Sequence, residues 1–86
     1  MSSIDDAVRH SLREFGALTV PVESLVETDD LYRLGLSSHA SVNVMLSLED
    51  EFDVEFPDSL LTKSTFQSIE NIREALLSAG AASVVL

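Results

Sequence analysis

The stretch LGLSSHASVNVMLSLEDEF, residues 34–52, decides the fold class of this chain. Gly35 gives a turn signal, and the apolar residues that follow recur at helical spacing on one broad face: Val42, Met45, Leu46, Leu48 or Glu49, and Phe52. Ser37 stands where a helix N-cap is expected, because its hydroxyl can accept a hydrogen bond from a backbone N–H one turn later. We therefore predict a helix from Ser38 to about Asp53, with its apolar face in the core.

A second helical pattern precedes this stretch. A helix over residues 3–15 is predicted by four apolar residues at four- and three-residue spacing on one face: Ile4, Val8, Leu12 and Phe15. Ser3 with Asp6 resembles a capping box at its start, and Gly16 is the expected stop.

A third pattern follows Pro57. Residues 58–61 are long enough for one short helical turn. Ser64 followed by Gln67 matches a capping box and predicts the start of a last helix that runs to Gly80. The residues of that helix at helical spacing are Phe66, Ile69, Ile72, Arg73 and Leu76.

Residues 17–37 mix turn-forming and apolar residues. Because a structureless loop of this length is unusual in a small domain, we expect an ordered connection over the core, with its apolar side chains buried and a short helical turn near residues 29–33. The predicted fold class is all-α: a four-helix bundle of three main helices and one short helix, with a long ordered loop after the first. We assign residues 1–80 to this domain and residues 81–86 to a flexible tail.

The composition limits the possible functions. The 86 residues include 15 acidic and 5 basic ones, so the formal charge is −10, which opposes nucleic-acid binding and favours protein partners with basic patches. The absence of cysteine excludes disulfides and thiol catalysis. The apolar runs are too short to span a membrane, and the acidic stretch MSSIDDAVRH does not resemble a signal peptide. We expect a cytoplasmic protein without a membrane partner.

Ser38 follows the expected cap at the first helical position, where its hydroxyl is exposed and free. The unpaired N–H groups and the dipole at a helix N-terminus also favour an anion there. A cap explains Ser37 but leaves Ser38 without a role. Ser38 is therefore a candidate position for a phosphate-containing group.

The run DLYRLGLSSHASVNVMLSLEDEF, residues 30–52, resembles the phosphopantetheine-attachment region of acyl carrier proteins, whose usual form is L-G-x-D-S-L followed by an acidic helix. The Leu-Gly step matches that form. Ser37 takes the position of the Asp, Ser38 that of the modified serine, and His39 that of the second Leu. Residues 56–58, FPD, resemble the family's downstream IPD-like element, and the resemblance covers almost the whole chain.

The motif GLSSHASV, with FDVEFPD downstream, is similar to a smaller group of free-standing aminoacyl carrier proteins. These are served by amino acid:[carrier protein] ligases that resemble the catalytic domain of seryl-tRNA synthetases. The resemblance implies 4′-phosphopantetheine on Ser38, flanked by Ser37 and His39, and a small amino acid such as glycine or alanine held as a thioester. It implies a non-enzymatic carrier, monomeric when free, whose partners are a phosphopantetheinyl transferase, a ligase or acyl-loading enzyme, and a downstream transferase.

The densest acidic cluster lies at residues 49–55 and suits either a docking face for basic enzymes or a solvated helix end. The predicted docking residues are Leu36, Ala40, Val42, Asn43, Glu49, Asp50 and Glu51. We expect no specific metal site, because the cluster lacks the alternating Asp ligands and central Gly of a calcium loop; weak divalent binding stays open.

Two other interpretations stay open. Because Ser37 and His39 depart from the fatty-acid pattern, an acyl carrier protein would serve a specialised fatty-acid or polyketide pathway. From another class, the chain could be an unmodified acidic helical adaptor. An enzyme has little support, because neither histidine belongs to a recognisable catalytic arrangement.

Overall fold

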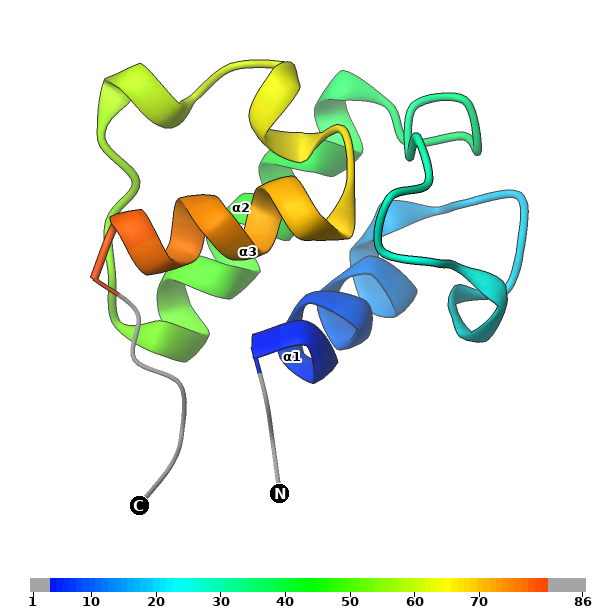
Figure 1. Cartoon of the computed structure of the whole chain (residues 1–86), viewed down its shortest axis with the longest axis horizontal. Helices are drawn as coiled ribbons and strands as arrows, with labels where there is room; N and C mark the ends of the chain where they lie inside the picture. Colours follow the sequence, from blue (N-terminus) through cyan, green and yellow to red (C-terminus); the bar gives the residue numbers. More distant parts are fainter. Residues whose placement is uncertain (1–3, 81–86) are drawn as a thin grey trace.

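Three α-helices form the frame of the molecule (Figure 1). The structure is a computed structural model, and it describes residues 4–80 of the chain. The helices are α1 (Ile4–Ser11), α2 (Ser38–Phe52) and α3 (Ile69–Ser78). Residues 4–80 contain no strand, so the predicted all-α class is confirmed. The short fourth helix is reduced to two 3-10 turns, Asp58–Leu60 and Ser64–Phe66. The predicted cap Ser3 and tail 81–86 lie outside the described residues.

The first helical segment is longer than α1, because α1 continues into a π-helical turn, Leu12–Gly16. Its buried residues are Ile4, Ala7, Val8, Ser11, Leu12 and Gly16. Phe15 is 46% exposed, so the prediction that it shares this face was wrong. A π turn holds more residues than an α turn, and the three-residue step from Leu12 therefore no longer returns Phe15 to the buried side.

α2 begins and ends close to the predicted positions, and it buries one side: Ala40, Ser41, Val44 and Leu48. Val42 and Leu46 are about half exposed, at 49% and 53%, whereas Met45 and Phe52 are partly buried against the core. The prediction that Leu46 is a core residue was wrong. The apolar stripe of α2 is wider than the face that the other elements cover, so Val42 and Leu46 lie outside that buried face.

The connection between α1 and α2 is ordered, as predicted, by hydrogen bonds to the chain at the start of α3. Leu31 N–H donates to the carbonyl of Gln67 (2.7 Å), and Glu70 N–H donates to that of Glu27 (3.0 Å). The connection buries Val22, Leu25, Leu31 and Leu36 but leaves Val26 57% exposed. Its helical turn is a 3-10 turn at Val22–Ser24, while residues 31–35 form hydrogen-bonded turns instead of the one expected at 29–33.

α3 starts four residues later than predicted. Ser68 is its N-cap, and Ser68 Oγ accepts a hydrogen bond from the backbone N–H of Asn71 at 3.1 Å. The predicted cap, Ser64, instead begins a separate 3-10 turn. Both serines are followed three residues later by an amide side chain, so the local pattern does not distinguish them. Gly80, with φ 107°, ends the helix as expected.

Candidate functional site

A tight turn directs the chain into α2. The N–H and hydroxyl of Thr19 both donate to the carbonyl of Leu34, at 2.8 and 2.9 Å. The next residue, Gly35, has φ 110°, and a Cβ there would lie 3.2 Å from the Thr19 backbone nitrogen. A side chain at residue 35 is therefore disfavoured both by the backbone conformation and by the close approach of the Thr19 backbone. The glycine of the Leu-Gly step thus has a structural role in the turn.

Ser37 is the N-cap of α2, as predicted. Its backbone is extended, and its Oγ accepts a hydrogen bond from the N–H of Ala40 at 3.0 Å. Ser38 follows as the first helical residue, with its side chain exposed. Its carbonyl accepts from Ser41 Oγ at 2.7 Å, but within residues 4–80 its hydroxyl makes no hydrogen bond. The Ser38 hydroxyl is therefore accessible to another enzyme.

A cleft of about 300 Å³ opens beside Ser38, between α2 and the segment that precedes α3. Its lining residues are Tyr32, Ser38, Ser41, Val42, Met45, Leu61, Thr62, Lys63 and Phe66. Most of this surface is apolar, and its one cationic side chain is Lys63. The volume is at the lower end of the range found for small-molecule sites.

Tyr32 and Lys63 form one edge of this cleft. Lys63 Nζ lies 5.0 Å from the centre of the Tyr32 ring, within the range of a cation–π contact. Burial raises the pKa of the Tyr32 phenol, and the negative charge of Asp30 also raises it, against the lowering effect of Ser41. The phenol therefore stays protonated at neutral pH. Neither residue is predicted from the sequence, because both lie in segments without a periodic pattern.

Two of the predicted docking residues need correction. Leu36 and Ala40 are only 4% and 6% exposed, because both pack into the core where α2 begins. Their side chains therefore leave almost no surface for a partner. Of the others, Val42, Asp50 and Glu51 are exposed and Asn43 is half-buried.

Glu49 has a role inside the molecule. Its Oε2 accepts a hydrogen bond from the backbone N–H of Phe56 at 2.9 Å, which holds the segment after α2 against the helix. Glu49 is therefore less available to a partner than Asp50 or Glu51.

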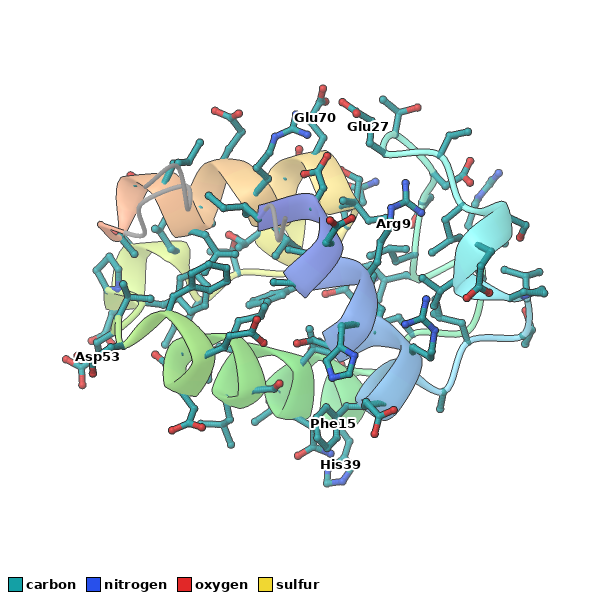
Figure 2. The ribbon with its side chains drawn as sticks, turned by 90° about the horizontal axis from the view of Figure 1, so that it is seen from below. Arg9, Phe15, Glu27, His39, Asp53 and Glu70 are labelled. Atoms are coloured by element: carbon teal, nitrogen blue, oxygen red, sulfur yellow. The ribbon has the colours of Figure 1, made fainter. Side chains whose placement is uncertain are left out.

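Exposed apolar side chains also occur near the start of α2. Figure 2 shows Phe15 and His39 at the same edge of the molecule, where the π turn packs against α2. Leu46 is a further exposed apolar side chain, and it lies on α2 itself. The sequence pattern predicts that Phe15 and Leu46 lie on buried faces, whereas both are about half exposed.

Residues 4–80 hold no cluster of three metal-ligating side chains, and none of their helices is long and apolar enough to cross a membrane. Within them, the candidate chemistry is concentrated at Ser38 and the cleft beside it.

A family model for phosphopantetheine attachment sites matches residues 16–76, which include the turn, Ser38 and most of α3. The chain belongs to the family of phosphopantetheine-binding carrier proteins. This confirms the resemblance found in the sequence. Proteins of this family bear 4′-phosphopantetheine and are carriers, not catalysts, so the predictions of this cofactor and of a non-enzymatic protein are also confirmed.

Two curated relatives are similar over most of this carrier protein. It is 46% identical over 69 residues to an aminoacyl carrier protein of Agrobacterium fabrum, covering 80% of this chain and 83% of the relative. It is 36% identical over 74 residues to acyl carrier protein 3 of Ralstonia nicotianae, covering 84% and 83%.

A solved structure is similar in fold as well as in sequence. It is a carrier protein from Agrobacterium tumefaciens, crystallised with an engineered glycine:[carrier protein] ligase of Bradyrhizobium japonicum and AMP. The TM-score is 0.82 at 44% identity, with 85% of this carrier protein and 97% of the other chain covered. At this identity the likeness extends beyond the fold.

The site of this carrier protein fits the family's prosthetic group. The group needs one accessible hydroxyl, and the exposed Oγ of Ser38 meets that need. The adjoining cleft offers apolar surface, from Val42, Met45 and Phe66, next to the cationic Lys63. A phosphodiester and a largely apolar arm are chemically compatible with these two kinds of surface.

Proposed function

We propose that this protein bears 4′-phosphopantetheine on Ser38 and holds a small amino acid, glycine or alanine, as a thioester between enzymes. The observation that carries this proposal is the exposed Ser38 hydroxyl, which makes no hydrogen bond within residues 4–80 and directly follows the Ser37 cap. The A. fabrum relative, an aminoacyl carrier protein, supports the amino acid cargo. The A. tumefaciens complex, with its glycine ligase, supports the loading partner.

The chemistry at Ser38 requires little of the carrier. Its Oγ attacks the pyrophosphate of coenzyme A in the site of a phosphopantetheinyl transferase, which supplies the base and metal. A phosphodiester forms on the serine, the proton passes to the transferase's base, and adenosine 3′,5′-bisphosphate leaves. When bound, the group supplies the thiol that forms the thioester. Ser37 contributes by fixing the end of α2, so that Ser38 is presented in a constant position.

The ligase would approach along the exposed side of α2. Asp50 and Glu51 offer negative charge to a basic partner surface, and Val42 and Leu46 offer apolar contact. Asn43 and His39 complete this docking face. We further propose that the protein works in the cytoplasm as a monomer when free, and that a downstream transferase receives the amino acid.

The test begins with intact-mass measurement after incubation with coenzyme A and a broad-specificity phosphopantetheinyl transferase. The wild-type chain and the Ser37→Ala variant should each gain one phosphopantetheine, and Ser38→Ala should gain none. The modified protein is then offered glycine, alanine and larger amino acids with a ligase of the A. tumefaciens type. Modification of Ser38→Ala, or failure of all amino acids, would contradict the proposal.

A second candidate is an acyl carrier for a specialised fatty-acid or polyketide pathway. The similarity to acyl carrier protein 3 of R. nicotianae favours it, as does the apolar lining of the cleft by Met45 and Phe66. Charging by a fatty acyl synthetase but not by an amino acid ligase would select this function. An unmodified adaptor would gain no mass from the transferase.

A further inference from the structure

Three of the five basic residues are occupied inside the molecule. Arg9 donates to two backbone carbonyls of the α1–α2 connection, at 3.0 and 3.1 Å. Arg13 pairs with Glu23 at 2.8 Å, and Arg73 pairs with carboxylates of α1 and of the connection at 3.0 and 3.3 Å. Arg33 and Lys63, in contrast, make no hydrogen bond or ion pair within residues 4–80. Of these two, only Lys63 lines the cleft that contains Ser38.

The position of Lys63 is unusual for a chain of charge −10. The surface carries many carboxylates that could pair with a lysine. The ammonium of Lys63 nevertheless lies over the ring of Tyr32, 5.0 Å from its centre. The Tyr32 phenol is an O–H donor at the same edge of the cleft. One cation and one neutral donor therefore face the cleft together, next to apolar surface from Met45 and Phe66.

We propose that Lys63 and Tyr32 form the anion-binding edge of the cleft, which holds the phosphodiester attached to Ser38 and so keeps the prosthetic arm against α2. This inference rests on the proposed modification of Ser38. A phosphodiester is negatively charged at neutral pH, and most of the molecular surface repels it because of the net charge. Lys63 supplies the opposite charge on the cleft wall, and its flexible side chain can leave the Tyr32 ring to reach the phosphate.

The same arrangement separates the two ends of a loaded arm. The phosphate end is attracted to Lys63, whereas the α-ammonium of an aminoacyl thioester is repelled by it. The middle of the arm can lie along Val42 and Met45, which reduces its exposure to water. Lys63 and Tyr32 thus act as positioning residues that restrict where the thiol travels.

The experiment uses protein modified with isotope-labelled pantetheine and compares Lys63→Gln with Arg33→Gln. Arg33 is a matched control, because it lines a neighbouring cavity with Tyr32 and its loss changes the net charge equally, but it does not line the Ser38 cleft. Lys63→Arg tests for rescue by another cation. Circular dichroism establishes that each variant keeps its helices.

In wild type and Arg33→Gln, modification should shift the NMR signals of the Tyr32 ring and Lys63, and the labelled arm should show contacts to Met45. In Lys63→Gln these shifts and contacts should weaken, and the arm thiol should react with a neutral alkylating reagent about 1.5- to 5-fold faster, the range that corresponds to the loss of an exposed ion pair. Lys63→Arg should restore the wild-type behaviour. High salt should make wild type resemble Lys63→Gln.

Two outcomes would overturn the inference alone: an arm equally mobile in wild type and Lys63→Gln, or an Arg33→Gln effect as large as that of Lys63→Gln. In both cases the mass increase on Ser38 would be intact, so the proposed function would stand. A wild-type chain that gains no phosphopantetheine would instead overturn the proposed function and this inference with it.

Discussion

Ser37 Oγ accepts a hydrogen bond from the backbone N–H of Ala40 at 3.0 Å, and this bond fixes the residue at which α2 begins. The adjacent Ser38 makes no hydrogen bond with its hydroxyl within residues 4–80. The two neighbouring serines therefore have different roles. Ser37 accepts a hydrogen bond from a backbone N–H at the helix N-terminus, and Ser38 keeps an accessible hydroxyl.

This difference in roles predicts opposite effects for two alanine variants. Ser37→Ala should lower the free energy of unfolding by about 0.5–2 kcal/mol, because the Ala40 N–H loses its acceptor, and should leave Ser38 modifiable. Ser38→Ala should change stability by less than about 0.5 kcal/mol but abolish the phosphopantetheine mass increase. Urea unfolding and intact mass measure the two effects. A stable Ser37→Ala variant that is no longer modified would show that the roles are exchanged.

The close approach of Gly35 to Thr19 predicts a large cost for a side chain. Gly35→Ala should destabilise the protein by about 2–4 kcal/mol, because the backbone has φ 110° and the new Cβ would lie 3.2 Å from a backbone nitrogen. Gly80→Ala is the matched control: φ is 107°, but nothing lies within 4 Å of the new Cβ, so a loss of about 1 kcal/mol is expected. If urea unfolding shows that the two variants lose the same free energy of unfolding, the close contact with Thr19 contributes nothing to the cost at Gly35.

Tyr32 is the single tyrosine of the chain, so its ionisation can be followed directly by ultraviolet absorbance. Burial raises its pKa above the ordinary value of 10.0, and the midpoint in the native protein should therefore exceed that in urea. Because the folded-state pKa is the higher one, the stabilisation is present below pH 10.0 and is lost as pH rises through the folded-state value. Identical midpoints in native and unfolded protein would contradict the burial of this ring.

The proposed docking face predicts salt-sensitive loading. Reversal of Asp50 and Glu51 to Lys should slow aminoacylation by the ligase about three- to tenfold at low salt and reduce its dependence on ionic strength. Glu74→Lys, an exposed reversal on α3 that also removes a 3.9 Å ion pair with Arg73, should have a smaller effect per charge on loading. Glu49 is unsuitable for this test, because its loss would also release the Phe56 N–H. Unchanged rates in the Asp50 and Glu51 variant would place docking elsewhere.

The sequence by itself determined the all-helical class, the Ser37 cap, the start of α2 at Ser38 and the stop at Gly80. These features depend on interactions within one turn of chain. A cap, a glycine with positive φ and an amphipathic repeat act over three or four residues, which a linear pattern contains in full. The resemblance to carrier proteins begins from the same stretch, and the family match extends over residues 16–76.

The tertiary structure alone decided which apolar residues are buried and what surrounds Ser38. Leu46 and Leu36 are both apolar, but exposure depends on which neighbours reach them: Leu46 is 53% exposed, and Leu36 is 4% exposed. The choice of Ser68 over Ser64 as a cap likewise depends on where the chain enters α3. Tyr32 and Lys63 are brought together at one edge of the cleft by packing between segments distant in sequence. No local pattern encodes a contact between two residues that lie 31 positions apart, the difference between 63 and 32.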